Sequence, residues 1–252
     1  MENNKEKIVT RQQLNKRNIV AFAIFFAMIL LVVVGWKWVN NAPKDNGVSS
    51  PLRAVLNTNE VLFSNYIYST GNFSKVYNPA EAAPKVRVNG DAGVGDNFDP
   101  SIWTLKVIRK PGDTLFVSLE EIKALPQTQV IFDFKCIEGW SQITHWGGVR
   151  FSDFVKKYNL SNQASMKYVG LDTPDKEYYV GIDTRSIMHP QTLLCYEMNG
   201  RPLPMDQGYP LRLIIPVKYG IKHLKRIGTI YFSNQKPKDY WYERGYDYYS
   251  GL

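Results

Sequence analysis

An uninterrupted apolar segment near the N-terminus most constrains what this chain of 252 residues can fold into. Residues 19–36 read IVAFAIFFAMILLVVVGW, which is 18 residues without a charge. A helix of this length just crosses the hydrocarbon core of a bilayer, which is about 30 Å thick. We therefore predict a transmembrane helix over residues 19–39. A cleaved secretory signal is the alternative, but the apolar run is longer than the usual signal core and no A-x-A cleavage site follows it.

Basic residues flank this segment mainly on its N-terminal side. Five of them precede it and two follow it closely: Lys5, Lys7, Arg11, Lys16 and Arg17 before, Lys37 and Lys44 after. The positive-inside rule then places residues 1–18 in the cytoplasm and everything after the helix outside. We expect a single-pass protein of the inner (cytoplasmic) membrane whose folded domain lies on the extracytoplasmic, periplasmic side.

The remainder of the chain divides into a tether and one folded domain. Residues 40–51, NNAPKDNGVSSP, lack apolar periodicity and are rich in turn formers, which is typical of a linker. The domain, residues 52–252, shows short strand patterns at 103–108, 129–136, 167–171, 178–182, 192–198, 211–215 and 228–232. Two short helices are expected, one after a capping box at Ser118 and Glu121 and one over residues 151–158. The pattern predicts a sheet-rich, mixed α+β domain without a dinucleotide-binding or P-loop motif.

Composition narrows the classes of function. The formal net charge is +8, but much of the excess lies in residues 5–17 and 218–226, and no nucleic-acid-binding motif occurs, so we expect no nucleic acid as a partner. The chain has two cysteines, Cys136 and Cys195, which are too few for a disulfide scaffold. The sequence alone does not decide whether these two form one disulfide bond. Cys195 lies in TLLCYEMNG, a strand pattern before an Asn-Gly turn, and is interpreted as a core residue.

Cys136 closes an alternating strand pattern in VIFDFKCIEGW. Val130, Phe132, Phe134 and Cys136 should share one face of that strand, and the cysteine would then reach a cleft where the strand ends. Its position permits three roles: a core residue, a nucleophile, or a ligand to a soft metal. The chain offers three histidines as partners, at 145, 189 and 223, but none lies in a protease signature or a zinc-ligand pattern.

The segment 208–232 concentrates basic residues beside apolar ones. Arg212 lies within the apolar strand pattern LRLII, and a buried guanidinium needs an anion. Five further basic or histidine residues crowd around Gly220: Lys218, Lys222, His223, Lys225 and Arg226. This spacing suits either a phosphate-binding site or a solvated basic loop beside a strand.

Four segments together resemble a known family. They are NEVLFSNY at 59–66, FKCIEGWS at 134–141, MHPQTLLCYEMNGRPLPMDQGYPLRLIIPVKYGIKHLKRI at 188–227 and YWYERGYDYYSG at 240–251. Their order resembles the molybdopterin-binding domain of the sulfite oxidase superfamily, and in particular its bacterial branch with the catalytic subunit of protein-methionine-sulfoxide reductase. The resemblance implies a molybdenum-dependent oxidoreductase that binds molybdenum-molybdopterin.

The resemblance also implies roles for individual residues. Cys136 would be the thiolate ligand of molybdenum, as suits a soft sulfur donor. The cofactor and its phosphate would be held by Arg212, His223 and Lys225, with Lys222 of the same basic segment and with Asn65, Thr173 and Gln207 as further contacts. Gln207 departs from the family pattern, in which an asparagine or a histidine is usual.

The resemblance bears on the substrate and the partner as well. Sulfite-oxidising members have an arginine-rich pocket after the cysteine, whereas no arginine occurs here between Cys136 and Arg150. We therefore expect oxygen-atom transfer on a small S-oxide or related substrate, with Glu138 as a proton relay beside Trp140 and Trp146. Electrons would be exchanged with a separate partner such as a membrane haem protein or cytochrome. The alternatives are an anchored binding module without metal, a sulfite-oxidising enzyme and a cysteine hydrolase.

Overall fold

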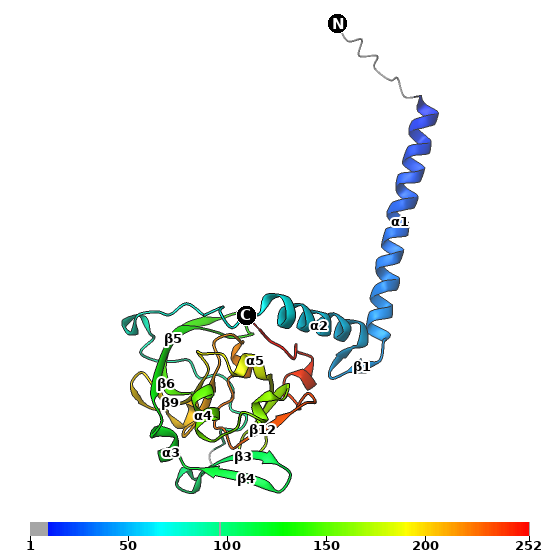
Figure 1. Cartoon of the computed structure of the whole chain (residues 1–252). Helices are drawn as coiled ribbons and strands as arrows, with labels where there is room; N and C mark the ends of the chain where they lie inside the picture. The colour runs from blue at the N-terminus through cyan, green and yellow to red at the C-terminus, as the bar shows by residue number, and fades with distance from the viewer. Residues whose placement is uncertain (1–9, 96, 252) are drawn as a thin grey trace. The chain divides into compact units, whose positions relative to one another are not determined.

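The computed structural model describes residues 10–95 and 97–251 (Figure 1). The chain divides into two compact units, residues 1–54 and residues 55–252. The basic residues Lys5 and Lys7, on which the predicted orientation partly depends, lie outside the described residues.

The first unit consists of one long helix and a small hairpin. Helix α1 (Arg11–Asn41) contains the predicted membrane segment and begins at a capping box, in which Thr10 and Gln13 exchange hydrogen bonds between side chain and backbone. Its 31 residues would reach about 46 Å, more than a bilayer core requires. Strands β1 (Lys44–Asp45) and β2 (Val48–Ser49) then pair around Asn46 and Gly47, both at positive φ. The segment expected to be a tether is thus partly an ordered hairpin.

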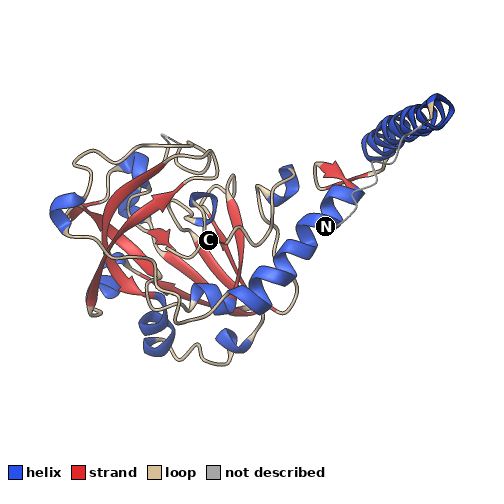
Figure 2. Ribbon diagram, turned by 90° about the horizontal axis from the view of Figure 1, so that it is seen from above, coloured by secondary structure: helices blue, strands red, loops and turns tan. Residues whose placement is uncertain are grey.

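Two five-stranded sheets form the second unit, and the strands lie at its centre with short helices around them (Figure 2). The first sheet has the order β4-β3-β12-β7-β8, with bounds Asp113–Val117, Leu105–Lys110, Thr229–Ser233, Tyr168–Asp172 and Tyr179–Asp183. The second has the order β10-β9-β6-β5, with β11 also on β9, and bounds Arg201–Pro202, Leu193–Met198, Ser141–Arg150, Gln127–Lys135 and Arg212–Ile214. This sheet-rich, mixed architecture confirms the predicted fold class.

The helices are short. After α2 (Ser50–Leu62) and a π-helical turn (Phe63–Ile67) come α3 (Leu119–Lys123), α4 (Phe151–Lys157) and α5 (Thr184–Ile187). The predicted capping box is confirmed, because Glu121 N–H donates to Ser118 Oγ and the Glu121 carboxylate accepts from Ser118 N–H. Three strands and two helices of this unit are absent from the sequence prediction: β4, β6, β10, α2 and α5.

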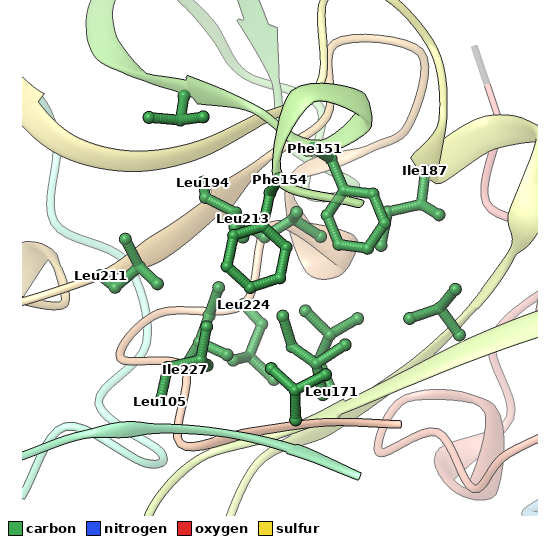
Figure 3. Close-up of a cluster of buried hydrophobic side chains, with 14 of the residues drawn as sticks. Leu105, Phe151, Phe154, Leu171, Ile187, Leu194, Leu211, Leu213, Leu224 and Ile227 are labelled. Carbon is green, nitrogen blue, oxygen red and sulfur yellow. The ribbon is translucent and has the colours of Figure 1, made fainter. Parts of the chain in front are cut away.

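One large apolar cluster joins the two sheets. Phe151 and Phe154 of α4 are fully buried and point into it (Figure 3). They meet residues of β9 and β11 from one sheet and residues of β3 and β7 from the other, among them Leu194, Leu213, Leu105 and Leu171. The burial of these side chains fixes the two sheets against each other.

Candidate functional site

The tip of the β5–β6 hairpin forms the centre of the candidate site. The ladder runs from Gln127↔Val149 to Lys135↔Ser141, so the turn 136–140 projects beyond its end. Cys136 N–H donates to Trp140 O (2.9 Å), Gly139 N–H donates to Cys136 O (3.0 Å), and Gly139 takes a φ of 89°. A residue with a side chain is strained at that φ, so glycine lets the turn close tightly. The turn holds Cys136 at a fixed position with only 6% of its surface exposed.

A cavity of about 360 Å³ opens beside this turn. Its size is in the range of ordinary ligand sites. It brings together many of the residues singled out in the sequence: Cys136, Glu138, Trp140, Trp146, Gln207, Arg212, His223 and Lys225. These residues come from the hairpin, from β11 and from the loops on either side of β11, so they are distant in sequence but adjacent in space.

Glu138 is tied into a short hydrogen-bond network beside the thiol. Its Oε1 accepts from Asn89 Nδ2 (3.2 Å), and its Oε2 accepts from Trp140 Nε1 (3.0 Å). Asn89 Nδ2 also lies 3.7 Å from Cys136 Sγ, and the Arg87 guanidinium stacks on the Trp140 ring at 4.7 Å. The bonds from Asn89 and Trp140 lower the pKa of the Glu138 carboxyl, so the ionised form is favoured. The carboxylate is an acceptor in this arrangement, and its role as a proton relay stays a prediction.

Cys136 has the character of an unactivated thiol. Burial raises its pKa, and the nearby Glu138 carboxylate adds to that effect. His223, which lines the same cavity, cannot serve as its base: His223 Nδ1 accepts from Ile215 N–H (3.4 Å) and Nε2 lies 3.1 Å from Lys218 O. Burial and the Arg212 charge lower the His223 pKa to about 3, so the ring is neutral. A thiol of this kind is a poor nucleophile, whereas metal coordination would deprotonate it.

Arg212 is a buried cation in need of an anion. Its Nη1 donates to Gln207 O (3.1 Å) and Gln207 Oε1 (2.8 Å), and its guanidinium lies 4.5 Å from the centre of the Trp146 ring. Arg212 Nε has no hydrogen-bond partner among the described residues. Burial lowers its pKa to about 10, so the group remains charged at neutral pH. The cavity wall therefore carries an uncompensated positive charge.

Lys225 adds a second cation to this wall. Its Nζ donates to two carbonyl oxygens, Gly90 O (2.8 Å) and Asp206 O (3.0 Å). Burial, followed by the Arg212 charge, lowers its pKa to about 8. An anion bound between Arg212 and Lys225 would satisfy both groups.

Three of the predicted cofactor residues do not reach the cavity. Lys222 is buried, but its Nζ binds Asp239 Oδ2 and Gly181 O (3.1 Å), and it does not line the cavity. Thr173 is buried, with its hydroxyl bonded to Asp175 and to Tyr178 O, and Asn65 is exposed in the π-helical turn. Their positions follow from local contacts that the basic and polar pattern alone does not reveal.

Other cavity residues were not predicted individually. Asn89, in VNGDAGVGD, belongs to a loop without apolar periodicity, so the sequence gives no signal for its place in the site. Four further lining residues form a row of rings with centroids 4.9–5.3 Å apart: Tyr178, Tyr240, Trp241 and Tyr246. Three of these rings come from the tail segment YWYERGYDYYSG, so that aromatic-rich motif supplies a wall of the cavity.

The donor set can be tested against a molybdopterin. Among residues 10–95 and 97–251, no group of three or more histidine, cysteine or carboxylate side chains could hold a metal ion. A single cysteine can serve a metal that brings its other ligands with it, as sulfur-ligated cofactors do. The unpartnered Arg212 Nε and the Lys225 ammonium suit the phosphate of such a cofactor. The residues present therefore fit the group.

Comparison with known proteins gives a consistent result. Residues 92–241 match the family described as the oxidoreductase molybdopterin binding domain. The provisionally named protein-methionine-sulfoxide reductase subunit YedZ1 of Azospira oryzae is 31% identical over 210 residues, which cover 82% of this chain and 78% of that protein. The protein-methionine-sulfoxide reductase catalytic subunit MsrP of Xanthomonas axonopodis pv. citri is 36% identical over 161 residues, 57% of this chain and 48% of the relative. The chain thus spans about half of MsrP.

Among solved structures, the sulfane dehydrogenase SoxCD of Paracoccus pantotrophus is similar at 15% identity and a TM-score of 0.48. The alignment covers 56% of this chain and 40% of that one.

Proposed function

The chain belongs to the family of oxidoreductases with a molybdopterin-binding domain, and from this premise we propose that it is an anchored enzyme that transfers an oxygen atom to or from a small S-oxide. The observation that supports the proposal best is that one cavity is lined by the buried thiol of Cys136 and by two cations that could bind an anion, Arg212 and Lys225. Residues 52–252 would form the catalytic domain. Residues 19–39 would anchor it, with residues 1–18 in the cytoplasm and the domain on the periplasmic side.

The first task of the chain is to hold the cofactor. Cys136 would supply the thiolate ligand to molybdenum, and Arg212 and Lys225 would bind the phosphate. Gln207 keeps the Arg212 fork in place through two hydrogen bonds to Nη1, and the Trp146 ring supports its other face. The two-electron redox chemistry of oxygen-atom transfer comes from the cofactor when it is bound.

The second task is to shape the space around the thiolate. Glu138 fixes both the Asn89 amide, which points at the sulfur, and the Trp140 ring at the rim. An amide that donates to a thiolate stabilises its negative charge. The aromatic part of the cavity lining, with Tyr178 and Trp241, would exclude water and accept the apolar part of an S-oxide.

Oxygen-atom transfer also requires an external electron partner. Reduction of an S-oxide to a thioether consumes two electrons and two protons and releases water, and no second redox centre is recognisable in the sequence. A separate electron donor, such as a membrane haem protein, would supply the electrons.

The proposal is tested on full-length protein from a host that makes molybdopterin. We expect stoichiometric molybdenum by elemental analysis and reduction of methionine sulfoxide with a reduced viologen as donor. Cys136→Ser should abolish turnover and remove the thiolate signature from the molybdenum electron paramagnetic resonance spectrum. The matched control Cys195→Ser changes the other cysteine, which is fully buried and does not line the cavity, and should retain both. Absence of molybdenum from the native protein would instead favour a metal-free binding module.

A further inference from the structure

Helix α2 and the π-helical turn after it expose an apolar stripe. Its members recur at helical spacing along one face: Val55, Leu62, Phe63, Tyr66 and Ile67. Their exposed fractions range from 38% to 79%. A large apolar surface of this kind usually marks an interaction site.

Polar groups on another face of this element bind the rest of the domain. The Glu60 carboxylate binds Lys236 Nζ (2.5 Å), and Ser64 O accepts from Arg185 Nη1 (3.2 Å). Shortly after the turn, Tyr68 O–H donates to Arg185 O (2.8 Å). The half-buried face of this element therefore carries Glu60 and Ser64 together with Leu56, while the apolar stripe is exposed.

The position of this helix in the chain identifies what covers the stripe. Helix α1 ends at Asn41 and α2 begins at Ser50. A link of this length spans at most roughly 30 Å even when fully extended, and the β1–β2 hairpin shortens it. If α1 spans a bilayer, α2 cannot leave the vicinity of the membrane surface.

The side chains suit such a surface. Phe63 and Tyr66 are aromatic residues of the type that concentrates at the boundary between headgroups and acyl chains. Lys37 and Lys44, in the last part of α1 and in β1, are exposed and would attract anionic headgroups.

We propose that the stripe formed by Val55, Leu62, Phe63, Tyr66 and Ile67 lies in the lipid–water interface. The domain is then seated on the membrane through two elements, α1 across the bilayer and α2 along its surface. This inference rests on the proposed anchoring by α1 and adds a second, peripheral lipid contact that fixes the distance of the domain from the bilayer.

The test uses the full-length, cofactor-loaded chain in nanodiscs of phosphatidylcholine and phosphatidylglycerol, so that lipid is the only partner offered. An environment-sensitive fluorophore is attached through Tyr66→Cys. Two matched positions serve as controls: Val61→Cys, exposed on another face of the same helix, and Ile102→Cys, exposed by 80% elsewhere in the domain. The native cysteines are both buried, which keeps labelling selective.

We expect the label at residue 66 to show blue-shifted emission, strong quenching by lipids with a spin label near the headgroup, and weak quenching by iodide. Labels at 61 and 102 should be quenched more by iodide than by lipid. If the label at 66 is as accessible to iodide as the label at 102, the inference is overturned. Loss of the chain from the discs in an alkaline wash would instead refute the proposed membrane anchoring by α1. The molybdenum content of the same preparation tests the proposed enzymatic function separately.

Discussion

Replacing Lys222 with methionine should destabilise the fold without emptying the cofactor site. Lys222 and Asp239 form an ion pair whose side chains are exposed by only 1% and 2%. The Lys222 ammonium also donates to Gly181 O (3.1 Å). Removing it leaves the Asp239 carboxylate buried without its cation, a change that typically lowers the free energy of unfolding by about 3–5 kcal/mol.

The assay is urea unfolding of the full chain in detergent, followed by tryptophan fluorescence, with molybdenum content measured on the folded fraction. The double variant Lys222→Met with Asp239→Asn removes both charges and should recover part of the loss. Lys225→Met is the matched control, because Lys225 lines the cavity and its ammonium donates, within the described part of the chain, to carbonyl oxygens alone. We expect this control to cost about 1 kcal/mol in stability and to lose cofactor.

The opposite pattern would refute the reasoning. If Lys222→Met unfolded at the urea concentration of the native protein and yet lost molybdenum, then Lys222 would contact the cofactor, as the sequence pattern suggested. The ion pair with Asp239 would then contribute nothing measurable.

Three further predictions follow from buried groups. The folded-state pKa of His223 is lowered to about 3, so the unfolded chain binds a proton at this residue first as the pH falls. The free energy of unfolding should therefore be highest above pH 6.5 and should drop by about 2 kcal/mol by pH 5. Unfolding curves measured over this pH range should show that His223→Gln lacks this part of the loss. Gly181→Ala places a Cβ 1.9 Å from the Tyr248 hydroxyl and should cost about 1–3 kcal/mol; an unchanged melting temperature would contradict this. Cys136 in loaded protein should resist iodoacetamide, and removal of the cofactor should expose a slowly reacting thiol; equal labelling of both forms by mass spectrometry would count against ligation.

Much of the fold follows from local pattern. The alternation in QVIFDFKC predicts the strand that ends next to Cys136, and the structure gives β5 as Gln127–Lys135 with the cysteine just beyond it. The capping box at Ser118 is a purely local signal and is confirmed. Strand β6 was missed because SQITHWGGVR mixes polar residues with two glycines and so lacks a clear period of two. Gly148 is nevertheless required there, since a Cβ would lie 2.2 Å from Leu194 O.

The site was only partly predictable because side-chain direction depends on tertiary contacts. The resemblance pointed to Cys136, Arg212 and Lys225, and the cavity contains all three. Lys222 lies in a single 3-10 turn, Gly220–Lys222, where no periodicity indicates which way a side chain points. The loop with Asn89 has no periodicity either, and its approach to Cys136 depends on a contact 47 residues away in sequence.

The distribution of buried cations shows why one of them needs a ligand. Four buried cations follow the start of β11: Arg212, Lys218, Lys222 and Arg226. Lys218 pairs with Asp183 (2.9 Å) and Lys222 with Asp239, while Arg226 donates to the carbonyl oxygens of Gly95, Met205 and Tyr209. Arg212 contacts only the neutral Gln207 and the Trp146 ring among the described residues, and its Nε is unbonded. A guanidinium held this way beside a cavity is costly in free energy, and an anion bound in the cavity would offset that cost. Carboxylates neutralise Lys218 and Lys222, so we expect the remaining charge at Arg212 to favour an anionic ligand such as a phosphorylated cofactor.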